Sequence, residues 1–229
     1  MQTPLDDARL EALLDELHAR SSEQEEHTRA YFARRAAEGT LSWKGMDEET
    51  HGFLADKLVA LDRDKALFCH QLCRAIDART VVEVGTSCGV STLYLAAAVR
   101  ANAVGGGRDG LVIGTEHEPT KAAAARALFE RAGLASLIEL REGDLRETLK
   151  SLEGPIDFVL FDIWVEMARP ALELIAPHLR RGSVLVADNT AAVPGPYADY
   201  FAFLKEPPGR FSTITLPFEG GLEMTVRGN

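Results

Sequence analysis

The sequence lacks any apolar run near the roughly 20 residues that a membrane-spanning helix needs. It is also short of positive charge: 25 Lys and Arg residues stand against 35 Asp and Glu residues, for a net charge of −10. That balance, without a cluster of basic residues, argues against a broad nucleic-acid surface. The opening residues MQTPLDDARLEALLDEL are acidic and amphipathic, so we expect no signal peptide there.

The chain has few cysteines, and they show no paired C-x-x-C spacing. There are three, Cys69, Cys73 and Cys88, which is an odd number. Cys69 and Cys73 share one face of a predicted helix, and this favours two packed, reduced thiols over a zinc site. We therefore expect a reducing, cytoplasmic setting.

Composition is that of a globular protein, with 46% hydrophobic and 26% charged residues in a length of 229. Helical patterns cover residues 5–38, 47–60 and 64–78. We expect residues 1–62 to form an N-terminal helical extension and residues 63–229 to form the main domain.

The first helical pattern carries a leucine stripe that must be buried. It can pack on the main domain or on a second copy of the chain, and the second possibility predicts a homodimer. The stripe consists of Leu5, Leu10, Leu13, Leu14 and Leu17.

From Thr80 onward, short apolar strands alternate with helical patterns. This alternation predicts an α/β fold, a mainly parallel sheet with helices on both faces. The last two strands are close enough to pair as an antiparallel hairpin. The predicted strands are residues 81–84, 111–115, 136–140, 156–161, 183–187, 211–216 and 222–227.

A glycine turn joins the first strand to its helix in the stretch TVVEVGTSCGVSTLYLAAAVR. Such a turn places backbone N–H groups beside the positive end of a helix dipole, which suits a nucleotide-like ligand. Gly85 and Gly89 are spaced G-x-x-x-G, so the dinucleotide fingerprint G-x-G-x-x-G is not met. A nicotinamide dehydrogenase is therefore disfavoured.

Polar residues stand at the carboxyl end of every predicted parallel strand, where such sheets bind ligands. An acid at the end of the second strand can accept the ribose hydroxyls of an adenosine, although Glu116 can also cap the next helix. Asp144 can cap a helix or lie at the adenine, and His117 can line the pocket or lie on the surface. The set consists of Glu83, Glu116, His117, Gly143, Asp144, Asp162, Trp164, Asp188 and Asn189.

Three of these residues form a candidate metal site. Asp162, Asp188 and Asn189 offer hard oxygen donors at neighbouring strand ends, which suit Mg²⁺. The alternative is a plain turn at Asp188 and Asn189, because both residue types favour turns.

The motifs VVEVGTSCGVST, GTEHEPTKA, REGDLRETL, IDFVLFDIW and VLVADN occur in that order. Together they resemble class I S-adenosylmethionine-dependent methyltransferases of the catechol and caffeoyl-CoA O-methyltransferase group, over about residues 60–229. The resemblance implies a Rossmann-like seven-stranded sheet with an antiparallel C-terminal strand, bound S-adenosylmethionine and a divalent metal, Mg²⁺.

The resemblance also implies roles for individual residues. Gly85, Ser87 and Ser91 would hold the methionine end of the cofactor. Glu83, Gly89, Gly143 and Asp162 are further candidate cofactor-binding residues. Glu116 and His117 would meet the ribose and adenosine, and the adenine would lie near Asp144, Leu145 and Trp164. The metal would be held by Asp162, Asp188 and Asn189.

Two positions depart from the pattern of this group. The lysine that usually follows the tryptophan and serves as general base is Val165 here, and Gly220 stands where an aspartate is common. With the lysine absent, Asp162 and Glu166 are the candidate catalytic residues.

The leading hypothesis is a metal-dependent O-methyltransferase that acts on a small hydroxylated, aromatic molecule. One alternative is a tRNA or nucleoside methyltransferase of the same fold. The other is a cofactor-binding protein without transferase activity, which the replacement of the lysine by Val165 would explain.

Overall fold

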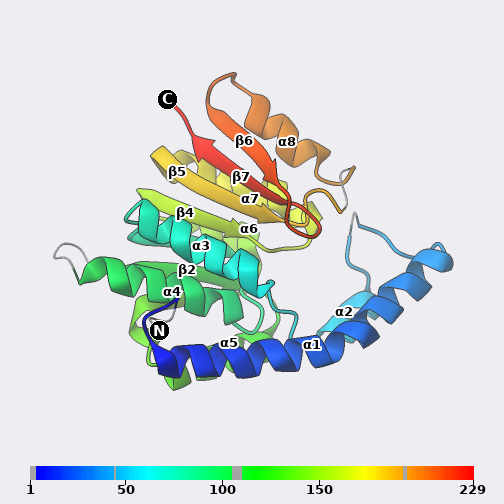
Figure 1. Ribbon diagram of the computed structural model, residues 1–229. Helices are drawn as coiled ribbons and strands as arrows, with labels where there is room; N and C mark the ends of the chain where they lie inside the picture. The colour runs from blue at the N-terminus through cyan, green and yellow to red at the C-terminus, as the bar shows by residue number, and fades with distance from the viewer. Residues whose placement is uncertain (1–3, 44, 105–109, 193–194) are drawn as a thin grey trace.

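A seven-stranded sheet forms the centre of the computed structural model, which describes residues 4–43, 45–104, 110–192 and 195–229 (Figure 1). The strand order is β3-β2-β1-β4-β5-β7-β6, and β1 to β5 run parallel while β7 is antiparallel to both its neighbours. The predicted fold class is confirmed. The strands are β1 Thr80–Val84, β2 Leu111–Glu116, β3 Ile138–Glu142, β4 Ile156–Phe161, β5 Leu179–Asp188, β6 Phe211–Leu216 and β7 Leu222–Arg227.

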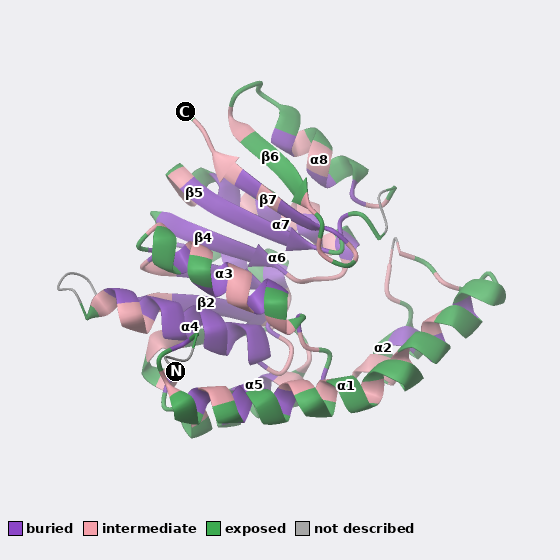
Figure 2. Ribbon diagram, in the orientation of Figure 1, coloured by how far each residue is buried: buried purple, intermediate pink, exposed green. Residues whose placement is uncertain are grey.

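Helices cover both faces of the sheet, so the central strands are buried on both sides (Figure 2). On β4, Phe158 and Leu160 face one hydrophobic cluster while Val159 and Phe161 face the other. The first cluster includes residues of α3 (Arg63–Ala75), α4 (Val90–Ala103) and α5 (Pro119–Ala132), and the second includes residues of α6 (Leu145–Thr148), α7 (Val165–Ile175) and α8 (Ala198–Lys205).

Most predicted element boundaries agree with the structure to within three residues, and the two larger differences have visible causes. The helix predicted over 47–60 is only α2, Glu48–Leu54. Beyond it, the main-chain N–H groups of Leu58 and Ala60 donate to side chains of the first helix, so they are not available for helical bonds. The fifth strand, β5, begins four residues early, because Leu179 already pairs with Ile156 before a register shift.

Single turns of 3-10 helix join several elements. They are η1 (Ala135–Leu137), η2 (Leu149–Ser151) and η3 (Ala176–His178). The first of these delays β3 by two residues relative to the predicted strand.

The N-terminal helix α1 (Ala8–Ala37) packs its leucine stripe against its own chain. All five leucines of the stripe belong to the same hydrophobic cluster as α4. Polar contacts join the same surfaces: Arg100 to Asp7 at 2.8 Å, and His18 to the hydroxyl of Tyr94 at 2.9 Å. Of the two sequence alternatives, burial on the main domain is the one observed. The stripe thus gives no support to the predicted homodimer.

The second half of α1 and helix α2 extend past the carboxyl ends of the parallel strands (Figure 1). The rings of Tyr31 on α1 and Phe53 on α2 stack with centroids 3.8 Å apart. Arg35 is 3% exposed, forms ion pairs with Asp47 and Glu49, and joins the end of α1 to the start of α2. These contacts hold the helical extension beside the edge of the sheet where a ligand is expected.

Within the described part of the chain, no helix is both long and apolar enough to span a membrane.

Candidate active site

The glycine turn brings the ends of β1 and β4 into direct contact. Gly85 has φ +93°, and a Cβ there would collide with the carbonyl oxygen of Asp162. The N–H of Asp162 in turn donates to the carbonyl of Val84 at 3.0 Å. Only glycine fits both the backbone conformation and this close approach. The turn then leads into α4, where Ser91 is buried in the first helical turn.

Glu83 is fully buried under this turn. One of its carboxylate oxygens accepts hydrogen bonds from the hydroxyls of Thr86 and Thr92, and the other has no partner among the described residues. Burial raises the pKa of Glu83 to about 7, against the opposing effect of the hydroxyl donors. A carboxylate held this way lacks a positive partner.

Glu116 is turned toward the glycine turn, as its predicted role at the ribose requires. Its two oxygens accept main-chain N–H groups from Ser87 and Glu118, both at 2.7 Å. The cap of α5 is Glu118 and not Glu116, because the Glu118 side chain accepts from Thr120. His117 lies exposed beside them.

The end of β3 is joined to the end of β2 by the N–H of Gly143, which donates to the carbonyl of Glu116 at 2.8 Å. Asp144 caps α6 by accepting from the N–H of Arg146, so the capping interpretation describes its present contacts. The Arg146 guanidinium lowers the pKa of Asp144 to about 2. Leu145 is buried in the core.

Trp164, at the end of β4, is covered by the helical extension. Its ring stacks on that of Trp43, with centroids 5.2 Å apart, and Trp43 in turn stacks on Phe32 of α1. The indole N–H of Trp164 is buried without a partner among the described residues. A second contact from the extension joins His51 of α2 to Glu118 at 3.3 Å.

Asp162 and Asp188 lie at the ends of the adjacent strands β4 and β5, with Lys65 of α3 beside them. The Lys65 Nζ is 2.8 Å from Asp188 Oδ1, and its side chain is 4% exposed. Burial raises the pKa of Asp162, and the negative charges of Asp188 and Glu83 raise it further. Burial raises the pKa of Asp188 too, and the Lys65 ammonium acts against this.

Asn189 completes the predicted metal set next to Asp188. Its backbone has φ +58°, and its amide nitrogen donates to Asp188 Oδ2 at 3.0 Å. A Cβ at Gly220 would collide with the amide oxygen of Asn189. An aspartate at position 220 would therefore not fit without moving Asn189.

The donor set fits a hard divalent cation. Among the described residues, no group of three or more His, Cys, Asp and Glu side chains could hold a metal ion. The candidate metal ligands are therefore two carboxylates, Asp162 and Asp188, and the amide oxygen of Asn189. Glu83 and Asp188 are buried and Asp162 is half-buried, and of these three acids only Asp188 forms an ion pair with Lys65. The remaining negative charge favours cationic ligands at this edge.

Val165 and Glu166 differ in where their side chains lie. Val165 is 8% exposed and packs in the hydrophobic cluster around α7. Glu166 is exposed on the first turn of α7, with its carboxylate close to Gly45 in the helical extension. It is thus directed toward the extension, and no ion pair or hydrogen bond of the described residues joins it to Asp162 or Asp188.

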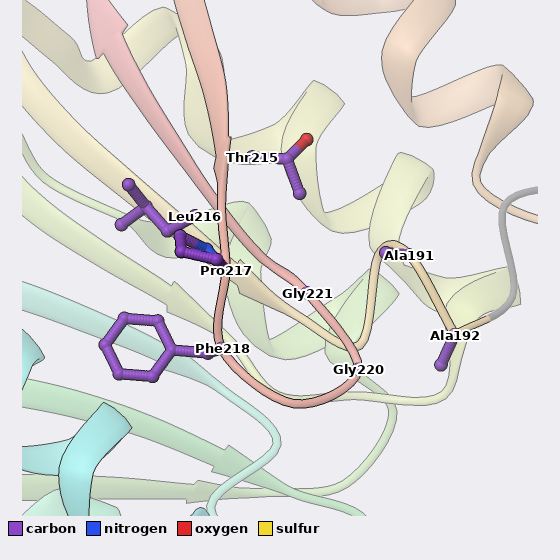
Figure 3. Close-up of a pocket in the computed structure, with 8 residues that line it drawn as sticks. All are labelled: Ala191, Ala192, Thr215, Leu216, Pro217, Phe218, Gly220 and Gly221. Carbon is purple, nitrogen blue, oxygen red and sulfur yellow. The ribbon is translucent and has the colours of Figure 1, made fainter.

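A hollow of about 520 Å³ lies beside Asn189, between the loop after β5 and the hairpin between β6 and β7 (Figure 3). The carbonyl of Gly220 accepts the N–H groups of both Ala191 and Ala192, at 2.9 Å each, and so joins the two segments. The lining is mainly apolar: Ala191, Ala192, Thr215, Leu216, Pro217, Phe218, Gly220 and Gly221.

Sequence reasoning missed Lys65 as a site residue. A signal was present, because Lys65 precedes Cys69 and Cys73 at helical spacing and so shares their buried face. No local pattern links Trp43 to Trp164.

Comparisons with known proteins show which proteins this chain is similar to. A family described as "Methyltransferase domain" matches residues 82–190. The chain is 36% identical over 132 residues to a catechol O-methyltransferase of Mycobacterium tuberculosis, which covers 57% of each chain. It is 30% identical over 139 residues to a catechol O-methyltransferase of Niastella koreensis, covering 57% of this chain and 58% of that one.

A solved structure of an O-methyltransferase is also similar to this chain. The O-methyltransferase from Bacillus cereus in complex with SAH has a TM-score of 0.65 and 25% identity, covering 73% of this chain and 82% of that chain. The chain spans a little over half the length of the two curated relatives.

Proposed function

This chain belongs to the S-adenosylmethionine-dependent methyltransferases of the catechol and caffeoyl-CoA O-methyltransferase group, and from that membership we propose a specific activity. It transfers the methyl group of S-adenosylmethionine to a hydroxyl of a small aromatic acceptor, with the help of a divalent cation such as Mg²⁺.

The observation that carries the proposal is the acidic cluster under the glycine turn. Glu83 is buried and Asp162 is half-buried, and both have raised pKa values, because removal from water penalises their charged forms. S-adenosylmethionine carries a sulfonium and an ammonium group, so it supplies positive charge that this edge lacks. The orphaned oxygen of Glu83 supports the same interpretation.

Three parts of the site would hold the cofactor. Gly85, Ser87, Gly89 and Ser91, in the glycine turn and the start of α4, would hold the methionine end of the cofactor. Glu116 and His117 would meet its ribose, and Asp144, Leu145 and Trp164 would flank its adenine. Each oxygen of Glu116 accepts one main-chain N–H group and can accept a second hydrogen bond from a ribose hydroxyl.

Asp162, Asp188 and Asn189 would hold the divalent cation. When bound, S-adenosylmethionine supplies the reactive methyl group, and the cation lowers the pKa of an acceptor hydroxyl. The chain's own residues align the partners and exclude water: Trp43 and Trp164 cover the site from the helical extension. The apolar hollow beside Asn189 gives room for the acceptor.

Glu166 is our candidate for accepting the proton of that hydroxyl. It is the exposed carboxylate next to Val165, where the group carries its lysine. A glutamate on the first turn of α7 needs a rotamer change to face the acceptor.

The test is methyl transfer from labelled S-adenosylmethionine to catechol, with a monophenol as the non-chelating comparison. We expect catechol to be methylated with Mg²⁺ and not with EDTA. Asp162→Asn should lower kcat/KM by about 100-fold, the factor that a few kcal/mol of lost transition-state stabilisation gives.

Glu147→Gln is the matched control, because it removes an exposed carboxylate that forms an ion pair with Lys150 and has no role in the proposed site. It should leave kcat/KM unchanged. Equal rates with Mg²⁺ and EDTA would show that the cation is not required. Glu166→Gln should lower kcat at acidic pH more than at alkaline pH, and an unchanged profile would remove Glu166 from the mechanism.

A further inference from the structure

Lys65 is a buried cation placed directly on a proposed metal ligand. Its Nζ lies 2.8 Å from Asp188 Oδ1 and 3.0 Å from Asp62 Oδ2, and its side chain is 4% exposed. A lysine is rarely buried to this degree unless it is paired. The ion pair with Asp188 therefore accounts for the position of Lys65.

Helix α3 fixes the direction of this side chain. Lys65, Cys69 and Cys73 are spaced by four residues, lie on one buried face, and turn it toward the sheet and α4. The ammonium group at the end of this side chain forms ion pairs with both Asp62 and Asp188.

Lys65 and a divalent cation would both bind the carboxylate of Asp188. Asp188 Oδ1 is engaged by Lys65 and Oδ2 by the amide nitrogen of Asn189. A cation bound by Asp188 shares that carboxylate with the ammonium, and like charges so placed repel each other strongly at a buried site.

We propose that Lys65 is a built-in counter-ion that competes with the divalent cation for Asp188 and keeps metal affinity low. The proposal rests on the proposed metal site. In the absence of metal, Lys65 compensates Asp188 and keeps this end of β5 in place. The cation is then taken up together with an acceptor that adds its own oxygen donors, and is not held permanently.

The experiment measures Mn²⁺ binding by electron paramagnetic resonance, without cofactor or acceptor. Three proteins are compared: the natural chain, Lys65→Met, which removes the charge but keeps the length, and Lys65→Arg, which keeps the charge. We expect Lys65→Met to bind Mn²⁺ more tightly by about tenfold or more, because the repelling charge is gone. Lys65→Arg should bind as weakly as the natural chain.

The possible Mn²⁺-binding results distinguish failure of the competition at Lys65 from failure of the proposed function. Equal or weaker Mn²⁺ binding by folded Lys65→Met overturns the competition, while the metal site itself stands if Mn²⁺ still binds. Absence of Mn²⁺ binding in all three proteins overturns both the competition and the metal site. Methyl transfer is measured separately and decides the activity.

A second pair of variants serves if Lys65→Met does not fold. Asp62 is exposed and shares the ammonium, so Asp62→Asn leaves Lys65 to Asp188 alone. Mn²⁺ binding should weaken by about two- to threefold, more than in Asp64→Asn, which removes a neighbouring exposed charge on the same helix. Equal binding by these two variants contradicts the proposal.

Discussion

The ring of Trp43 stacks on the ring of Trp164, with planes inclined by 25°. These are the chain's only two tryptophans, so its indole fluorescence reports on this single contact. Trp43 belongs to the helical extension and Trp164 to the carboxyl end of β4. The contact therefore links the extension to the proposed adenine site.

Trp43→Ala should uncover Trp164. We expect a red-shifted emission, stronger quenching by acrylamide, and a loss of about 1 kcal/mol of unfolding free energy from the aromatic pair. Trp43→Phe keeps a ring in the stack and should stay close to the natural chain in quenching. If Trp43→Ala is quenched no more than Trp43→Phe, the stack does not shield Trp164.

Arg35 and Arg34 form a matched pair for testing how the extension is held. Arg35 is 3% exposed and joins Asp47, Glu49 and the carbonyl of Thr40, whereas Arg34 forms its ion pairs in solvent. Arg35→Met should speed amide hydrogen exchange in α2 by about tenfold or more, since a local opening then needs less free energy. Arg34→Met should leave it near the natural rate, because surface pairs contribute little. Equal protection of α2 in both variants would contradict this role.

Glu83 makes the stability of the ligand-free protein depend on pH. Burial raises its folded pKa from 4.5 to about 7, so its stabilising contribution is full below pH 4.5 and is lost as the pH rises to about 7. The loss is about 3 kcal/mol at most. Urea unfolding from pH 5 to 8 should show a smaller decline in Glu83→Gln than in the natural chain, and parallel curves would assign the decline to other groups.

Gly85→Ala should destabilise the chain more than Gly133→Ala. Both glycines have positive φ, but a Cβ at position 133 meets no atom within 4 Å, whereas one at position 85 collides with the Asp162 carbonyl. We expect about 1 kcal/mol for Gly133→Ala, from backbone strain alone, and at least twice that for Gly85→Ala. Similar midpoints of urea unfolding for the two variants would mean that the turn accommodates a Cβ at position 85 at little cost in stability.

The sheet was predictable because its strands are short segments bounded by turn residues, and the central ones are apolar. Residues 156–161, 211–216 and 222–227 match β4, β6 and β7 at both ends. The length of α2 was not predictable, since the main-chain N–H groups of Leu58 and Ala60 donate to Gln24 and Ser21 on α1 beyond its end. Tertiary contacts of this kind leave no local signal.

Some residues of the candidate site were likewise predictable from the sequence, and others were not. The acids at the strand ends were found because topology alone gathers them at one edge. Lys65 was not found, because a lysine in a helical pattern is normally solvated and only its register with Cys69 and Cys73 indicates otherwise. The side-chain direction of Glu166 depends on a contact with the extension near Gly45, which sequence does not encode locally.

The packing of α1 on its own chain has a consequence for synthesis. The ribosome makes the leucine stripe before α4 and α5, whose residues Tyr94, Arg100 and Arg131 contact α1 in the finished protein. At a synthesis rate of about 5–20 residues per second, the leucine stripe is made several seconds before the segments that bury it. During that interval the growing chain exposes the leucines of α1, which are buried only after α4 has been made.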